Sequence, residues 1–168
     1  MIPTIQTILY ATDLAPQTYR VFRHALALAQ RHDAKIVLLH VIEPLGPTGE
    51  SLVRNVISDE KYQELKRSGL EQLHQEIHTR LERFCQEELG KHADEADEMA
   101  EIRVVQGQPA AVILREAENV DADVIVMGTH GYSRVARAFL GSVANKVLQH
   151  TRTPVFVVPL RANGEAPQ

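Results

Sequence analysis

The sequence predicts an α/β fold in which one open, parallel sheet carries helices on both faces. Short apolar runs rich in β-branched residues suit strands that are covered on both sides, and stretches with helical spacing of apolar residues lie between them. Strict alternation of such segments is typical of parallel sheets with right-handed crossovers. Because the 168 residues show no internal repeat and no separating linker, we expect a single domain.

Five segments are expected to be strands. Four are continuous apolar runs, and one weaker segment alternates polar and apolar residues, which suits an edge strand. The continuous runs are residues 5–10, 35–41, 124–127 and 155–158, and the alternating segment is residues 101–105.

Four segments are expected to be helices, at residues 16–31, 59–89, 108–119 and 141–150. Pro16 suits a first helical turn, where its missing N–H costs nothing. The second helix is long and carries an apolar stripe in an otherwise charged segment, formed by Tyr62, Leu65, Leu73, Ile77, Leu81 and Phe84. Residues 44–58 contain Pro, Gly and Ser and are expected to form a mobile loop before it.

Composition narrows the class of protein. Apolar residues make up 44% of the chain, charged residues 24% and aromatic residues 5%, which fits a globular protein with an aliphatic core. The net charge of −4 gives no reason to expect nucleic-acid binding. The single cysteine, Cys85, can form neither an internal disulfide nor, alone, a zinc site. Without a secretory signal or an apolar run of roughly 18 residues, a cytoplasmic protein with no membrane partner is expected.

Residues after the strands carry the chemistry, because ligands of open parallel sheets bind at the carboxyl ends of the strands. Gly128 and Gly131 allow close approach of a ligand, and Gly141 and Ser142 open the last helix, whose N–H groups attract phosphate. Asp13 follows the first strand and can accept hydrogen bonds from a ribose. The alternatives are a simple tight turn for the glycines and a helix cap for Asp13.

Other candidates carry weaker signals. His74 and His78 lie four residues apart on the long helix and can share a metal ion, but their order differs from HExxH, and a solvated face is the stronger interpretation. Arg134 and Arg137 can supply charge to a polyphosphate or lie on the solvated surface. Cys85 lacks a cysteine partner, which favours an inert thiol.

The pattern Gly128-x2-Gly131-x9-Gly141-Ser142 resembles the signature of the ATP-binding branch of the universal stress protein family. The segments 38–41 (Leu-Leu-His-Val) and 127–131 (Met-Gly-Thr-His-Gly) also resemble that branch. The resemblance extends from the first strand to the last. The chain contains neither GxxxxGK[ST] nor GxGxxG, which argues against a Walker-type NTPase and a dinucleotide dehydrogenase.

The resemblance implies a five-stranded sheet of order 3-2-1-4-5, with Asp13 on the ribose and the Val41 backbone at the adenine edge. It implies ATP with a divalent ion, Mg²⁺ or Mn²⁺, as the ligand. The residues it implies for the cofactor site are Ala11, Thr12, Asp13, Val41, Met127, Gly128, His130, Gly131, Gly141, Ser142 and Val143. Ala11 departs from the family pattern, in which proline is frequent at this position.

We therefore expect an ATP-binding stress-response or regulatory protein whose nucleotide state sets its conformation or its partners. The alternatives are a slow ATPase, disfavoured because no general base or nucleophile is evident, and a nucleotide-free dimeric scaffold, disfavoured by the intact signature. The domain is expected to span residues 1–160, with a flexible tail at 161–168. In the implied strand order, residues 155–158 are an edge strand, and they contain no charged residue. The resemblance also implies dimers joined through this strand, so a homodimer is expected.

Overall fold

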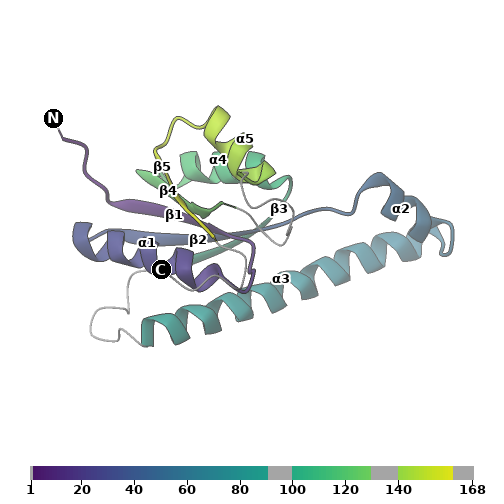
Figure 1. The fold of residues 1–168 in the computed structure, drawn as a ribbon. Coiled ribbons are helices and arrows are strands. Elements are labelled where there is room, and N and C mark those ends of the chain that lie inside the picture. Colours follow the sequence, from purple (N-terminus) through teal and green to yellow (C-terminus); the bar gives the residue numbers. More distant parts are fainter. Residues whose placement is uncertain (1, 91–99, 130–139, 161–168) are drawn as a thin grey trace.

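The computed structural model describes residues 2–90, 100–129 and 140–160 (Figure 1). Strands and helices alternate, with one additional helix after the second strand. In chain order the elements are β1 (Thr7–Thr12), α1 (Thr18–His32), β2 (Lys35–Ile42), α2 (Pro47–Arg54), α3 (Asp59–Gly90), β3 (Ala100–Gln106), α4 (Pro109–Asn119), β4 (Val124–Gly128), α5 (Ser142–His150) and β5 (Val155–Val158).

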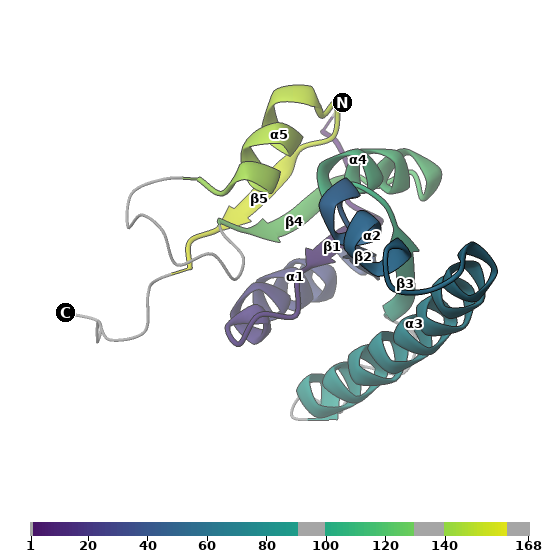
Figure 2. The ribbon, with the colours of Figure 1, turned by 90° about the vertical axis from the view of Figure 1, so that its right-hand side faces the viewer.

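The strands form one parallel sheet of order β3-β2-β1-β4-β5, which confirms the predicted topology. Helices α1 and α3 cover one face, and α4 and α5 cover the other (Figure 2). The chain therefore folds as a single three-layer domain. From β1 the chain adds β2 and β3 on one side of the sheet and β4 and β5 on the other. The switch point therefore lies between the carboxyl ends of β1 and β4.

Both faces of the central strands are buried, as their continuous apolar runs predict. In β1, Ile8 and Tyr10 pack toward α1 and α3, whereas Leu9 packs toward α4 and α5, and none of the three is exposed. This alternation follows from the two-residue period of a strand. Polar side chains are therefore expected just beyond the ends of the strands and not within them.

Most predicted boundaries agree with the structure to within one residue, and those of the first strand and the start of the first helix differ by two. The first strand runs from Thr7 to Thr12 rather than over residues 5–10, because its pairing with β2 starts at Thr7 and Lys35. Pro16 lies in a turn before α1 rather than in its first turn, since the N–H of Thr18 donates to the carbonyl of Ala15 at 2.9 Å. The first difference places the end of β1 directly before Asp13.

The expectation of a loop at residues 44–58 is wrong, because the segment contains helix α2. Pro47 in its first turn suits a helix start, but the helix is held by contacts with α3. The ring of Tyr62 lies 4.9 Å from the guanidinium of Arg54, and Lys66 pairs with Glu50 at 3.0 Å. These partners are distant in the sequence, so the local composition did not reveal them.

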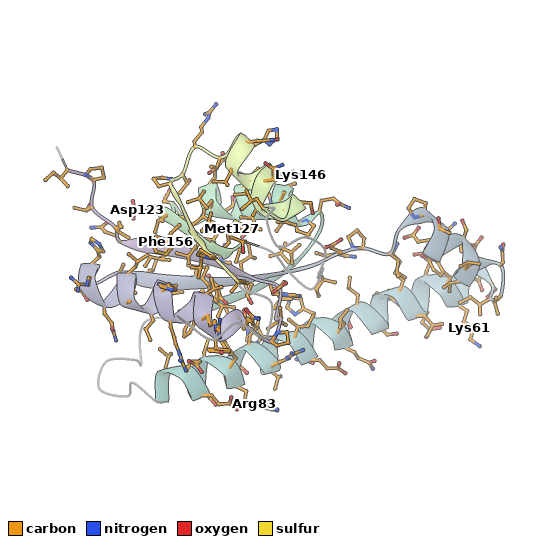
Figure 3. All side chains as sticks on the ribbon, in the orientation of Figure 1. Lys61, Arg83, Asp123, Met127, Lys146 and Phe156 are labelled. Atoms are coloured by element: carbon orange, nitrogen blue, oxygen red, sulfur yellow. The ribbon has the colours of Figure 1, made fainter. Side chains whose placement is uncertain are left out.

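Helix α3 is longer than the sheet it packs against. Its 32 residues extend over about 48 Å. Its N-terminal part and α2 project away from the sheet, with Lys61 at the far end and Arg83 near the domain (Figures 1 and 3). The predicted stripe is therefore buried only in part: Leu81 is 0% exposed, whereas Leu65 is 53% and Leu73 is 42% exposed.

Within the described part of the chain, no helix combines the length and the apolar character that crossing a membrane requires.

Candidate functional site

A cleft of about 770 Å³ opens at the carboxyl ends of β1, β2 and β4. We call it the strand-end cleft. Every predicted site residue that the structure describes lines it, namely Ala11, Thr12, Asp13, Val41, Met127, Gly128, Gly141, Ser142 and Val143. His130 and Gly131 lie outside the described residues, as do Arg134, Arg137 and the expected tail at 161–168. The fold thus brings together residues from three distant parts of the sequence.

The turn after β1 holds Asp13 at the cleft. Its Oδ1 accepts a hydrogen bond from the N–H of Ala15 at 3.0 Å, and the residue remains exposed. Asp13 therefore caps this turn and not helix α1, whose N-cap is Gln17. The carboxylate is oriented by the backbone without being buried, which suits a group that accepts hydrogen bonds from a ligand.

The side chain of Thr12 serves the fold rather than facing free into the cleft. Its hydroxyl bonds the hydroxyl of Thr18 and accepts from the N–H of Leu14 at 3.1 Å. Leu14 adopts a left-handed φ of 60°, an unusual conformation for a residue other than glycine. The turn is therefore held by several bonds that compensate for a strained residue.

His40 joins β2 to the end of β1 inside the cleft. Its Nδ1–H donates to the carbonyl of Thr12 at 2.9 Å, which assigns the tautomer. Burial lowers the pKa of His40 below its ordinary value of 6.5, although the bond to Thr12 and the charge of Asp13 act in the opposite direction. The imidazole is therefore neutral at neutral pH, with Nε2 as an acceptor.

This lowered pKa makes the stability depend on pH. The unfolded chain binds a proton at His40 near pH 6.5 and the folded chain only below it, so the free energy of unfolding falls as the pH decreases below 6.5. His40→Asn keeps a donor for the carbonyl of Thr12 but does not titrate. We expect its free energy of unfolding to fall less than that of wild type when the pH is lowered from about 7.5 to about 5.5. Urea unfolding at the two pH values measures the difference.

His150→Asn is the matched control, because His150 also bonds a backbone carbonyl through Nδ1, at 2.8 Å, but is exposed. The His150 variant is expected to keep the wild-type pH dependence. Equal pH dependence in wild type and His40→Asn would contradict the role of His40.

The other side of the cleft is built where β4 meets α5. The N–H of Gly141 donates to the carbonyl of Thr129 at 2.6 Å, which ties the start of α5 to the end of β4. A Cβ on Gly128 would lie 2.7 Å from Cδ1 of Leu160, so a larger residue here would make the side chain of Leu160 shift. Because Gly128 has no side chain, Leu160 packs against its backbone beside the cleft.

The N-terminus of α5 lines the cleft. Gly141 is the N-cap, with φ −59° and ψ 157°, and no side chain of the described residues caps the helix. The first N–H groups of a helix have no partner within it and carry the positive end of its dipole. With the hydroxyl of Ser142 beside them, these groups form an anion-binding position.

The ionisable side chains among the described lining are Tyr10, Asp13, His40 and Glu43, and none of these lining residues is a lysine or arginine. Among these described lining residues, the positive potential for an anion comes from the N-terminal backbone of α5.

Residues missed by sequence reasoning also line the cleft. Leu73 and Ile77 come from α3, Pro109 and Ile113 from α4, and Leu160 follows β5. The apolar stripe on the long helix was visible in the sequence, but it predicts contact with a core and not with a cleft. The signal that distinguishes Leu73 is its exposure, which only the structure shows.

The other candidate residues, His74, His78 and Cys85, have surroundings in the structure that explain them without a ligand. His74 bonds the carbonyl of Val104 through Nε2 at 2.9 Å, and His78 lies 3.5 Å from Glu82. Among the described residues, no group of three His, Cys, Asp or Glu side chains is placed to hold a metal ion. Cys85 is buried, as expected, and burial raises the pKa of its thiol to about 11, which makes it unreactive.

Known proteins are similar to this chain in both sequence and fold. The model of the universal stress protein family matches residues 4–159. A universal stress protein of Thermus aquaticus is 31% identical over 153 residues, covering 91% of this chain and 98% of that protein. The universal stress protein MJ0577 of Methanocaldococcus jannaschii is 27% identical over 154 residues, covering 90% of this chain and 93% of that protein.

Solved structures agree with this similarity. The structure of MJ0577 matches with a TM-score of 0.69 and 25% identity, covering 96% of this chain and all, 100%, of that one. A universal stress protein solved in complex with cAMP matches with a TM-score of 0.55 and 21% identity, covering 94% of this chain and 98% of that one.

Proposed function

Since this chain belongs to the universal stress protein family, we propose that it is a cytoplasmic ATP-binding regulatory protein of the stress response. The bound nucleotide sets its conformation or its choice of partner. The observation that carries the proposal is that the N-terminus of α5 and Asp13 line the same strand-end cleft, with no side chain of the described residues capping α5. An anion-binding helix end and a ribose-binding carboxylate in one cleft suit a nucleotide.

Each part of ATP has a counterpart in the cleft. The phosphates lie against Gly141, Ser142 and the amide of Val143, the ribose hydroxyls bond Asp13, and the adenine edge meets the backbone of Val41. The cleft, at about 770 Å³, lies within the 300–1,000 Å³ range usual for small-molecule sites. The relative solved with cAMP supports a nucleotide as the class of ligand.

A divalent cation, Mg²⁺ or Mn²⁺, accompanies the triphosphate in this proposal. The cleft fits such an ion because none of its described lining residues is a lysine or arginine, and Ser142 supplies an oxygen, the kind of ligand these ions prefer, at the α5 end. The ion supplies the charge that neutralises the phosphate oxygens. Ser142 offers a hydroxyl oxygen beside the phosphate position, and the backbone of α5 orients the phosphates.

Binding of ATP is expected to stabilise the folded protein, because a ligand specific to the native state shifts the unfolding equilibrium. At an ATP concentration of 100 times Kd, with Mg²⁺, the gain is about 2.7 kcal/mol, which raises Tm by about 5–10 °C. Differential scanning fluorimetry measures this shift. Absence of any shift at millimolar ATP, with no nucleotide in the freshly purified protein, would contradict the proposal.

Phosphate release distinguishes a binding protein from an ATPase. The proposal expects ATP to remain intact in the purified protein over hours, since binding and not turnover is the function. Steady release of phosphate that Gly131→Val abolishes would instead show an enzyme, and the description of the protein as a binding module would be wrong.

The proposal includes a homodimer formed through β5. This strand is at the edge of the sheet and contains no charged residue, and Phe156 is 39% exposed there. Pairing with β5 of a second copy covers the open edge by a two-fold contact. Analytical ultracentrifugation at micromolar concentration is expected to show a dimer, and Phe156→Lys is expected to shift it toward monomer. A wild-type monomer would contradict this part.

A further inference from the structure

We propose that Leu73 and Ile77, on helix α3, pack on the base of the bound nucleotide and give the strand-end cleft its preference for purines over pyrimidines. The inference rests on the proposed function and deepens it. It assigns a role to residues of the long helix that neither the glycine signature nor the strand ends contain.

The position of these residues separates them from the phosphate end. Leu73 and Ile77 line the cleft from α3, on the side of β2, where Ile42 and Glu43 also lie. The phosphate end is formed by α5 and the end of β4. Strand β1 lies between β2 and β4, so the two ends are separated by two strand spacings, about 10 Å. Residues of α3 therefore meet the nucleoside and not the phosphates.

A hydrogen bond holds this part of α3 in place. His74, the neighbour of Leu73, bonds the carbonyl of Val104 on β3 through Nε2 at 2.9 Å. Val104 pairs with His40 in the register of β2 and β3, so the turn of α3 that carries Leu73 lies level with His40 in the cleft. The helix wall is thus fixed at the height where Val41 offers its backbone to the base edge.

The exposure of Leu73 is the observation that points to a ligand. The side chain lines the cleft and yet is 42% exposed, so folding alone does not cover it. Ile77, one turn along the helix, is half-buried and packs in part against the core below the sheet. A flat apolar surface placed in the cleft covers the remaining area of both side chains. The face of a nucleobase is such a surface, and a purine covers more of it than a pyrimidine.

The contrast with Leu65 supports this assignment. Leu65 lies eight residues before Leu73, about 80° around the helix and farther from the sheet, and is 53% exposed, but it does not line the cleft. One helix thus offers two exposed leucines, of which one lines the cleft and the other does not. This pair provides a matched control.

The experiment measures affinities of the full chain by calorimetry for ATP, CTP and inorganic triphosphate, each with Mg²⁺. Leu73→Ala is expected to weaken the binding of ATP about tenfold and that of CTP less, because the base loses its contact with the leucine side chain. The affinity for inorganic triphosphate, which has no base, is expected to stay unchanged. Ile77→Ala is expected to act in the same direction. Leu65→Ala is expected to match wild type for all three ligands, and Leu73→Met, which keeps the apolar volume, is expected to retain ATP binding.

The outcomes separate this inference from the proposed function. Wild-type binding of ATP that Leu73→Ala leaves intact would overturn the inference alone, as would an equal loss for ATP and inorganic triphosphate. Wild-type protein that binds none of the three ligands would overturn both. Since Leu73 is exposed and Leu73→Ala removes little packing, the variant is expected to fold, which circular dichroism and its Tm verify.

Discussion

Gly141→Val is expected to weaken ATP binding at least about 100-fold while the protein remains folded. The valine side chain would stand at the N-cap of α5, in the space of the phosphates. Hydrogen bonds to charged groups contribute about 1.5–3 kcal/mol each, so losing two of them corresponds to a factor of 100 or more. The backbone of Gly141, with φ −59°, suits any residue, so the substitution introduces no backbone strain.

Calorimetry of ATP binding and a urea unfolding curve measure the two parts of this prediction. Gly69→Val is the matched control, because a Cβ at Gly69 on α3 meets nothing within 4 Å. The control is expected to keep wild-type affinity. If the folded Gly141→Val protein bound ATP as tightly as wild type, the phosphates would have to lie elsewhere.

Leu81→Ala is expected to lower the free energy of unfolding by about 2–5 kcal/mol, the range for truncating a buried leucine. Leu81 is 0% exposed and belongs to the core cluster beneath the sheet, together with Phe22 and Cys85. It anchors the C-terminal part of α3 to the domain. Chemical denaturation with a two-state analysis measures the change.

Leu65→Ala is the comparison for this prediction, since it makes the same truncation in the same helix at a 53% exposed position. Its free energy of unfolding is expected to stay within about 0.5 kcal/mol of wild type. Similar losses in both variants would mean that the N-terminal part of α3 is packed against the domain.

The comparison of prediction and structure is most informative along α3. The apolar stripe predicts a helix correctly, because helical spacing is a local property of the chain. It does not predict which leucines are buried, because burial depends on where the sheet ends. Each step of eight residues also turns about 80° around the helix, so Leu81 meets the core, Leu73 meets the cleft and Leu65 meets solvent.

In the segment 44–58, local composition predicted the wrong secondary structure. Its Pro and Gly content indicated a loop, yet Tyr62, Arg54 and the pair of Lys66 with Glu50 hold a helix there. A short helix of this kind is stabilised by its contacts more than by its own residues. Thr12 is a related case, since the residue lines the cleft as expected but its hydroxyl is bonded to Thr18 and Leu14.

By itself, the sequence determined the alternation of strands and helices, the burial of the central strands on both faces and, through its resemblance to the family, the strand order. It also identified Asp13, Gly128 and Gly141 as residues of one site. Apart from the strand order, these properties follow from the spacing of apolar residues and from the residue types that come directly after the strands, which are local features of the chain. The tertiary structure alone decided that α3 forms a wall of the cleft, that Gly128 admits Leu160, and that burial lowers the pKa of His40. Each of these depends on atoms brought together from distant parts of the chain, and a sequence pattern carries no distances between such atoms.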